Sequence, residues 1–343
     1  MKIRKILNKQ SINIKFPLNI KEKDKYLFTR ELKRKIGVAY CYYFNDILIK
    51  SNSYPKIYDL NIIKDFLKFN SLSKFLLIKK LILLIIYLKN TFFFNKPNKN
   101  IPKAMIVYDR HSENYFHWLT DVIPKIIWAK KNKELKDYKI IIPKFLNKFQ
   151  VHTIQALTKN YVIIDDLTTL KVSKLIYISE FHPSGLPRKN FLYATKKFYI
   201  NKYNEKNSFR KIYISRSNAH RRRLKNEKDL INILKKNNFN IIKPENLSFK
   251  NQVNIFRNSS TLISLHGAGL TNLLWMKKRS NIIEIRDSND FTLNPYFVLS
   301  QQMGHKYYYH LSKKNHYSNN IFHPDYELDV DNFYKIFSKV IKF

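Results

Sequence analysis

The sequence has little cysteine and little glycine for its 343 residues. Its single cysteine, Cys41, excludes a disulfide within the chain, and we interpret the protein as intracellular or as indifferent to oxidation. Only five glycines are present, so two glycines close together need a local reason. Hydrophobic residues make up 44% and charged residues 26% of the chain, which excludes wholesale disorder.

Long unbroken apolar runs are also missing. The most apolar region, residues 75–94, is interrupted by Lys79 and Lys80, and the longest remaining run is residues 81–88. A helix that spans a bilayer needs about 20 apolar residues. We interpret the region as a buried helix or as a helix resting on a membrane surface, with a membrane span as a third alternative. The first residues lack the apolar core of a secretory signal, so we expect none.

Acidic residues are scarce relative to basic ones. The chain has 64 lysines and arginines against 25 aspartates and glutamates, a net charge of +39. Nucleic-acid-binding and membrane-bound proteins show such an excess, but an AT-rich genome also favours lysine. Here the excess is spread along the whole chain rather than gathered in one tail. We expect no nucleic-acid partner and retain a peripheral contact with an anionic membrane as an alternative.

Short apolar segments alternate with helical ones from Ala104 onward, whereas the first hundred residues are weakly patterned. The predicted strands are residues 104–108, 139–142, 161–164, 175–178, 212–215, 239–242, 261–265 and 282–285. The predicted helices are residues 115–130, 144–157, 190–201, 227–236, 248–257, 271–277 and 331–342.

This alternation is typical of parallel sheets covered by helices on both faces. It occurs twice in series, so the predicted fold class is α/β, with two Rossmann-like domains facing a cleft. We place these domains at residues 101–205 and 206–325, after an N-terminal extension at 1–100 and before a C-terminal helix at 326–343.

Two of the five glycines lie in one tetrad, His266, Gly267, Ala268 and Gly269, which is followed by Leu270, Thr271 and Asn272. The tetrad separates a predicted strand from a predicted helix, and open α/β sheets place ligands at that edge. Glycines let backbone N–H groups approach a phosphate, and the helix N-terminus adds positive potential. A tight turn that needs glycine for geometry alone is the structural alternative.

Arginines follow another predicted strand at its carboxyl end. Arg216 comes directly after that strand, and Arg221, Arg222 and Arg223 follow shortly. A guanidinium offers a planar pair of donors that suits a diphosphate, although a run of charges is often only a solvated loop. Glu284 lies within an apolar strand, where its carboxylate needs a partner, either a ribose hydroxyl or a buried arginine.

His117 and Asp121 follow the first predicted strand of residues 101–205. They are four residues apart, so on a helix they share one face. A carboxylate or imidazole in this position can deprotonate an incoming hydroxyl. The alternative is a His–Asp pair that only holds the domain together. Trp118 we assign to the core.

Five segments together carry a family resemblance. They are NYFHWLTDVIP at 114–124, YISRSNAHRRRLKNE at 213–227, PENLSFKNQVNIF at 244–256, HGAGLTN at 266–272 and IIEI at 282–285. In their residues, order and spacing these segments resemble the family 61 glycosyltransferases of the capsular-polysaccharide type, over residues 104–310. No single segment is specific, but five in order are. The family often has an acidic residue where this chain has Asn251, and we expect the change to concern the helix cap.

The resemblance implies a GT-B-like fold and an inverting transfer of a sugar from a nucleotide-sugar donor. It implies that residues 206–325 bind the nucleotide-sugar and that 101–205 form the acceptor side. Residues 1–100 carry no such resemblance, and we interpret them as part of the acceptor domain or as membrane-apposed. Carried over by motif, the nucleotide-sugar site would comprise Arg216, Arg221, Arg222, His266, Gly267, Ala268, Gly269, Thr271, Asn272 and Glu284. His117 and Asp121 would be catalytic on the acceptor side, and we choose Asp121 as the base.

The remaining acidic motifs do not favour a metal. Asp329 and Asp331 have the spacing of a metal-binding DxD motif but precede the last predicted helix and suit its cap. Asp165 and Asp166 have no neighbouring ligands. Arg216 and the helix after the tetrad can neutralise a departing diphosphate instead, so we predict no metal and no cofactor.

These expectations combine into one functional hypothesis. The protein would be cytoplasmic, peripheral at the inner membrane face, and would add a sugar to a glycan or lipid-linked acceptor in bacterial surface polysaccharide biosynthesis. The alternatives are a nucleic-acid-binding protein that uses its basic surface and a catalytically inactive relative that binds nucleotide or glycan.

Overall fold

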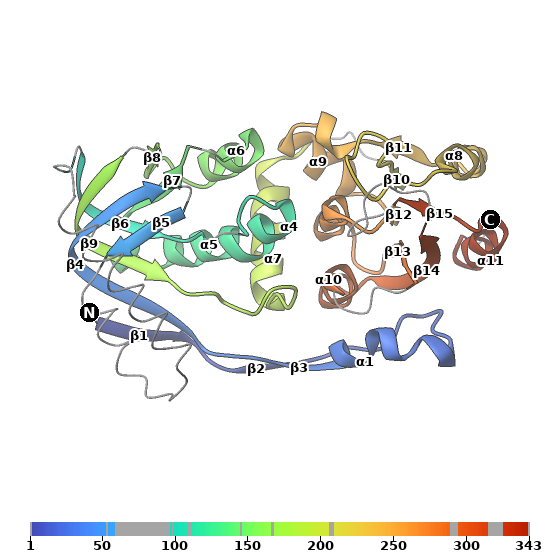
Figure 1. The fold of residues 1–343 in the computed structure, drawn as a ribbon, viewed down its shortest axis with the longest axis horizontal. Coiled ribbons are helices and arrows are strands. Elements are labelled where there is room, and N and C mark those ends of the chain that lie inside the picture. The colour runs from blue at the N-terminus through green and yellow to red at the C-terminus, as the bar shows by residue number, and fades with distance from the viewer. Residues whose placement is uncertain are drawn as a thin grey trace. The chain divides into compact units, whose positions relative to one another are not determined.

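The computed structural model describes residues 2–52, 54–58, 97, 99–108, 111–144, 146–165, 168–205, 209–288, 294–314 and 325–341 (Figure 1). The apolar region at 75–94, for which a buried or membrane-apposed helix was predicted, lies outside these residues, as does Asp166. Within them, no helix combines the length and the apolar character needed to cross a bilayer.

The chain divides into two compact units, each built from separate segments of the sequence. The first unit comprises Met1–Asn8, Val38–Glu113 and Lys125–Glu180, and the second comprises Lys9–Gly37, Asn114–Pro124 and Phe181–Phe343. This division differs from the continuous domains that we predicted. The chain enters the second unit twice before residue 181, because Lys9–Gly37 and Asn114–Pro124 pack with elements that come much later in the sequence.

The first unit contains a mixed sheet in the order β1-β4-β9-β6-β7-β8, with β5 paired to β4. Strands β9, β6, β7 and β8 run parallel, whereas β1, β4 and β5 add antiparallel pairs. The strands are β1 (Lys2–Leu7), β4 (Ala39–Asn52), β5 (Tyr54–Tyr58), β6 (Lys99–Ile106), β7 (Lys139–Pro143), β8 (Tyr161–Ile164) and β9 (Thr169–Ile178). The helical segments are α5 (Ile123–Lys131), which begins in the second unit, a 3₁₀ turn (Lys133–Leu135) and α6 (Lys148–Leu157).

The second unit contains a sheet in the order β11-β10-β12-β13-β14-β15, parallel except for its last pair. Its strands are β10 (Lys211–Ile214), β11 (Asn240–Ile242), β12 (Thr261–Leu265), β13 (Asn281–Asp287), β14 (Lys306–Lys314) and β15 (Tyr326–Glu327). Its helices are α4 (Tyr115–His117), a π-helical turn (Trp118–Val122), α7 (Lys189–Lys202), α8 (Glu227–Lys236), a 3₁₀ turn (Pro244–Asn246), α9 (Phe249–Phe256), a 3₁₀ helix (Ala268–Trp275), α10 (Pro295–Met303) and α11 (Val330–Val340).

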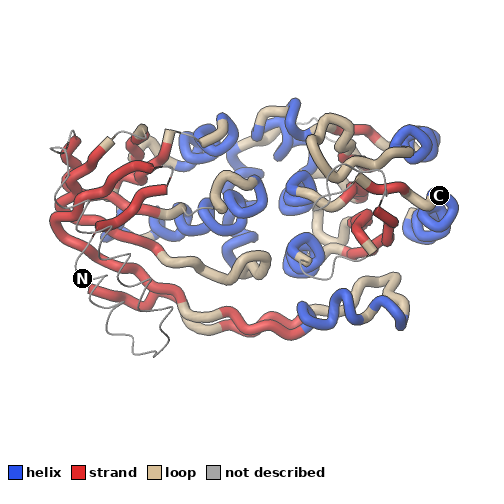
Figure 2. Tube along the Cα trace, viewed as in Figure 1, coloured by secondary structure: helices blue, strands red, loops and turns tan. Residues whose placement is uncertain are grey.

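Helices cover both faces of this second sheet, as Figures 1 and 2 show. Helices α8 and α11 lie on one face, where Leu230, Leu234 and Phe337 join the apolar side chains of β12 and β13 in one buried cluster. Helix α10 and the Ala268–Trp275 helix lie on the other face. Burial on both faces explains why the strands of this sheet are almost continuously apolar.

The predicted α/β class with parallel sheets is therefore confirmed, and several elements have the predicted bounds. Strand β8, strand β12 and helix α8 match residue for residue. Ser248 accepts a hydrogen bond from Asn251 N and caps α9, and Asp329 caps α11 as predicted. The arrangement of two domains around a cleft stays a prediction.

Two predicted helices differ in type from the structure. The helix predicted at 115–130 contains the π-helical turn Trp118–Val122, a form that is frequent at functional sites. The helix predicted at 271–277 is a 3₁₀ helix that begins earlier, at Ala268, where Leu270 N donates to Gly267 O at 3.0 Å. Gly267 before this helix and Gly269 within its first turn are poor α-helix formers, which favours the short, tight form.

An N-terminal arm, Lys9–Gly37, is part of the second unit. It forms the hairpin β2 (Gln10–Asn13) and β3 (Lys33–Ile36), a 3₁₀ turn (Glu22–Asp24) and α1 (Tyr26–Leu32). Leu18 N donates to Tyr307 O at 2.9 Å. Phe28 is fully buried, and its ring packs against Phe297 and Tyr309 with centroid distances of 5.1 and 4.9 Å. The arm therefore contributes core side chains to a unit formed mostly by the C-terminal half.

Replacing Phe28 with alanine should reduce the free energy of unfolding by about 3–5 kcal/mol, because it leaves a cavity in this aromatic core. Tyr26→Ala is the matched control in the same helix. Its ring is 63% exposed, so the change should stay within about 0.5 kcal/mol. Denaturant unfolding of both variants measures the difference, and equal losses would contradict a core role for the arm.

Candidate functional site

The site predicted from the arginines and the glycine tetrad lies at one edge of the second sheet. Strands β10 and β12 are parallel neighbours, with Ile214 opposite Ser264. Because both strands end at the same edge, the residues that follow them, Arg216 and His266, are brought close together. We call the tetrad at residues 266–269 the glycine turn.

Arg216 is held by the loop that follows it. Its Nε donates to the carbonyl oxygen of Arg222 and its Nη2 to that of Arg221, both at 3.0 Å. Arg222 supplies its carbonyl from a left-handed backbone conformation, with φ of 57°. Burial, followed by the charge of Arg222, lowers the pKa of Arg216. The guanidinium is therefore oriented by the protein itself.

Gly267 makes room for Arg216, whose guanidinium packs directly on its backbone. A Cβ at this position would lie 2.2 Å from Nη1 and 2.9 Å from Cζ of Arg216. Gly267 has an extended backbone, with φ of 163°, so its conformation does not require glycine. Gly269 meets a different neighbour, since a Cβ there would lie 3.2 Å from Cγ2 of Ile214. Ala268 lies between them, half-buried.

The three consecutive arginines have different surroundings. Arg223 forms an ion pair with Asp325, in which Nη2 lies 2.9 Å from Oδ2. Burial alone would raise the pKa of Asp325, but the hydrogen bonds from Arg223 outweigh it and lower the pKa. Arg221 is exposed and Arg222 half-buried beside Arg216. Arg223 thus joins the loop to β15, and the other two support the position of Arg216 through their backbone.

His266 is paired with Glu284. Nδ1 of His266 lies 2.5 Å from Oε1 of Glu284, and Tyr307 donates its hydroxyl to Oε2 at 2.5 Å. Burial alone would raise the pKa of Glu284, but the hydrogen bond and charge of His266, then Arg286, lower it. Both carboxylate oxygens accept from protein side chains. Glu284 therefore orients His266, where we had expected a ribose hydroxyl or a buried arginine as its partner.

Asn272 is fully buried next to the glycine turn, where its side chain makes four hydrogen bonds. Its Oδ1 accepts from Tyr115 OH at 2.9 Å and from Trp275 Nε1 at 3.1 Å. Its Nδ2 donates to Gln252 Oε1 at 3.0 Å and to Gly269 O at 3.2 Å. Thr271 is also fully buried. The hydrogen bonds of Asn272 go to the protein, which indicates that it shapes the turn.

His117 and Asp121 are in contact, as the four-residue spacing predicts. Nδ1 of His117 lies 2.7 Å from Oδ2 of Asp121. The other oxygen, Oδ1, accepts from Thr120 Oγ1 at 2.6 Å and lies 3.4 Å from Nε2 of His182. Burial alone would raise the pKa of Asp121, but the charge of His182 and the hydrogen bond of His117 outweigh it and lower the pKa.

The two histidine–carboxylate pairs belong to the same compact unit, although we predicted them in different domains. Aromatic rings connect them. Phe116 contacts His117 at a centroid distance of 5.4 Å and Tyr296 at 5.6 Å, and Tyr296 contacts His266 at 5.0 Å. The segment Asn114–Pro124 thus places His117 and Asp121 in the unit that carries Arg216 and the glycine turn.

Sequence reasoning missed His182, Tyr296 and Tyr115. His182 stands alone in a loop, far along the chain from Asp121, with no motif around it. Tyr296 is the second residue of α10, a helix whose pattern indicates only burial. Of the three, only Tyr115 lies within a segment that we had singled out, NYFHWLTD. A buried tyrosine hydroxyl needs an acceptor, so this residue could have been predicted to make a hydrogen bond near the site.

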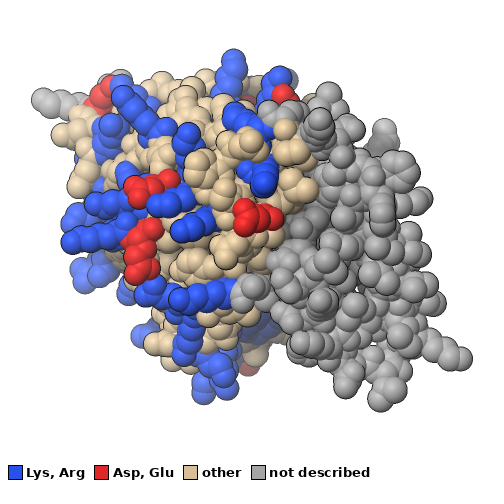
Figure 3. Space-filling model, turned by 90° about the vertical axis from the view of Figure 1, so that its left-hand side faces the viewer, with Lys and Arg blue, Asp and Glu red and all other residues tan. Residues whose placement is uncertain are grey.

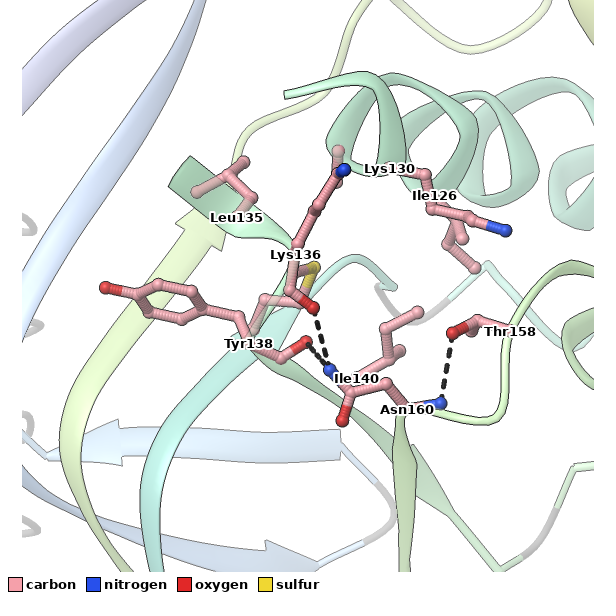
Figure 4. Close-up of a pocket in the computed structure, with 10 residues that line it drawn as sticks. Ile126, Lys130, Leu135, Lys136, Tyr138, Ile140, Thr158 and Asn160 are labelled. Carbon is pink, nitrogen blue, oxygen red and sulfur yellow. Dashed lines mark hydrogen bonds between the residues drawn. The ribbon is translucent and has the colours of Figure 1, made fainter. Parts of the chain in front are cut away.

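Other features of the described surface do not compete with this site. Basic side chains are spread over the face drawn in Figure 3, with some acidic ones among them. A cavity of about 160 Å³ in the first unit is lined by ten residues, with Asn160 hydrogen-bonded at its edge (Figure 4). None of the predicted site residues lines it. Among the described residues, no three His, Cys, Asp or Glu side chains are grouped to hold a metal ion.

Comparison with known proteins agrees with the resemblance of the sequence. The family model described as Glycosyltransferase 61 matches residues 115–283. The matched stretch begins at Tyr115, includes both His117 and the glycine turn, and ends one residue before Glu284. No curated protein matches the chain. The family match supports a glycosyltransferase.

Replacing Gly267 with alanine should destabilise the second unit by about 1–3 kcal/mol, because the new methyl group overlaps the guanidinium of Arg216. Gly37→Ala is the control, since a Cβ there meets no described atom within 4 Å. It should change the free energy of unfolding by no more than about 0.5 kcal/mol. If thermal or denaturant unfolding separates the variants by less than that, Arg216 does not pack as described.

The Glu284 carboxyl should make stability depend on pH. Its pKa in the folded state lies below the ordinary value of 4.5, so its contribution is present above that value and is lost as the pH falls through the folded pKa. Wild type should therefore exceed Glu284→Gln in unfolding free energy at pH 7, and the difference should shrink between pH 5 and about pH 3. Denaturant titrations across this range measure it. A constant difference would show that ionisation of Glu284 does not stabilise the fold.

Proposed function

We propose that this protein is an inverting glycosyltransferase that takes its sugar from a nucleotide-sugar. The observation that carries the proposal is the oriented guanidinium of Arg216 against Gly267, in the same compact unit as the pair His117–Asp121. The family match over residues 115–283 supports sugar transfer. The geometry supports the assignment of the two functions that such a transfer needs, a base and a site for the leaving diphosphate.

The reaction is one in-line displacement. The acceptor oxygen forms a bond to the anomeric carbon of the sugar while the bond from that carbon to the diphosphate oxygen breaks, and the configuration inverts. The proton of the acceptor hydroxyl goes to the base, and the electron pair of the broken bond goes to the diphosphate. The protein must therefore accept one proton and stabilise a growing negative charge on the leaving group.

For the base we now favour His117 over Asp121, which the sequence had led us to choose. Asp121 accepts at one oxygen from His117 and at the other from Thr120, and its lowered pKa makes it a weak base. An ionised Asp121 fixes the proton of His117 on Nδ1, so Nε2 is the nitrogen that takes the proton from the acceptor. Asp121 then stabilises the imidazolium, as the aspartate of a Ser–His–Asp triad does.

The leaving diphosphate is assigned to Arg216, the glycine turn and the 3₁₀ helix that starts at Ala268. The first N–H groups of that helix lack partners within it and carry positive potential. His266, ordered by Glu284, stands at the same turn. Arg221 and Arg222 complete a positive loop around Arg216. We propose that these groups neutralise the diphosphate without a metal.

The acceptor is proposed to be a glycan or a lipid-linked glycan of a bacterial surface polysaccharide, met at the inner face of the cytoplasmic membrane. The basic surface supports a peripheral contact with anionic lipid. In the N-terminal arm, exposed Leu18 and Tyr26 stand among lysines such as Lys21 and Lys23, a composition typical of membrane-surface segments.

Nucleoside diphosphates test the donor site. One of UDP, GDP or CDP, held at about 100 times its dissociation constant, should add about 2.7 kcal/mol to the free energy of unfolding. The shift should persist in EDTA and vanish in Arg216→Ala. His117→Ala should keep the shift but lose turnover about 100-fold or more, measured as release of the diphosphate from the matching nucleotide-sugar.

Three other outcomes would contradict parts of the proposal. A shift that needs a divalent cation would contradict transfer without a metal. A shift with no turnover in wild type would indicate an inactive relative that only binds nucleotide. No shift with any nucleotide, together with DNA binding that weakens steeply as salt rises, would indicate a nucleic-acid-binding protein.

A further inference from the structure

His182 is a buried histidine whose two ring nitrogens both face backbone carbonyls. Nδ1 lies 3.0 Å from the carbonyl oxygen of Pro183, and Nε2 lies 3.0 Å from that of Thr120. Its side chain is 2% exposed. A carbonyl oxygen only accepts, whereas a neutral imidazole carries a single N–H. The imidazolium is the one form of His182 that donates to both.

A buried imidazolium needs a negative charge nearby, and the carboxylate of Asp121 lies next to His182. Nε2 of His182 lies 3.4 Å from Oδ1 of Asp121. The same carboxylate is bound on its other side by Nδ1 of His117 at 2.7 Å. The three side chains form a row in which a carboxylate lies between two imidazoles, and Thr120 contributes to it with both its carbonyl and its hydroxyl.

A second buried histidine of the same unit shows the contrast. Nε2 of His305 also lies 3.0 Å from a carbonyl oxygen, that of Leu273. Its Nδ1, however, makes no hydrogen bond among the described residues. Burial, and next the charge of Lys196, lower the pKa of His305 to about 4. His305 is therefore neutral near pH 7, and the carboxylate of Asp121 beside His182 is what distinguishes the two sites.

We propose that His182 is a positioning residue whose buried imidazolium keeps the Asp121 carboxylate ionised and aimed at Nδ1 of His117. This inference rests on the proposed function, in which His117 is the base. Held in this way, Asp121 keeps His117 in the tautomer with its proton on Nδ1. Each turnover then begins with Nε2 in the basic form, and the charge that develops on His117 meets an ionised partner.

Protonation can be observed directly and without any activity. In the full chain labelled with ¹⁵N-histidine, the spectrum at pH 7 should show His182 with protons on both ring nitrogens and His305 with one. His182→Gln and His305→Gln identify the signals by their loss. A single proton on His182 would overturn the proposal, whether or not the protein transfers sugar.

Kinetics test the positioning role. His182→Gln keeps an amide donor but removes the charge, and it should lower kcat about 10- to 100-fold while the KM for the nucleotide-sugar stays within about twofold. His305→Gln, which also removes a buried imidazole facing a carbonyl, should leave kcat within about twofold. Circular dichroism verifies the fold of both, and His182→Asn replaces His182→Gln if that variant does not fold.

The outcomes separate the inference from the function on which it rests. Equal losses of kcat in the two variants, or a loss confined to KM, would overturn the role of His182 even if wild type is an active transferase. If wild type shows no turnover, the proposed function fails, and the ¹⁵N spectrum still decides whether His182 is the buried cation.

Discussion

The second unit depends on the donors that surround two carboxylates, those of Glu284 and Asp121. Glu284 lies in the middle of a parallel strand with 1% of its surface exposed, and an ionised carboxylate there is costly unless donors surround it. His266 and Tyr307 supply those donors from the neighbouring strand end and from β14. The position of Glu284 thus determines how the imidazole of the glycine turn is oriented. Removing either donor would leave a buried charge only partly compensated.

The same constraint acts at Asp121, but with partners that come from one helical segment and one distant loop. Thr120 and His117 are near in sequence, so the π-helical turn brings them to the carboxylate locally. His182 reaches it from 62 residues beyond Thr120. Because the loop of His182 must stay docked against this turn, the charge arrangement also ties Asn114–Pro124 to the second unit.

The sequence predicted what depends on local pattern and on parallel register. The alternation of apolar segments was sufficient for β8, β12 and α8, and the rule that parallel strands end at one edge brought Arg216 to the glycine turn. Contacts between segments that are far apart in the sequence could not be predicted from its pattern. Nothing local indicates that Lys9–Gly37 packs under β14, or that His182 meets Asp121, since both depend on contacts between segments with no shared periodicity.

Gly267 shows how a correct residue can be chosen for an incomplete reason. We expected glycine so that a phosphate could approach the backbone, whereas the structure places the guanidinium of Arg216 there. The two reasons are connected. A guanidinium held by the carbonyls of Arg221 and Arg222 does not have to reorganise when negative charge develops in front of it, and such preorganised donors stabilise a leaving group most effectively. In the reaction that we propose, Gly267 therefore acts on the leaving anion indirectly, by making room for Arg216.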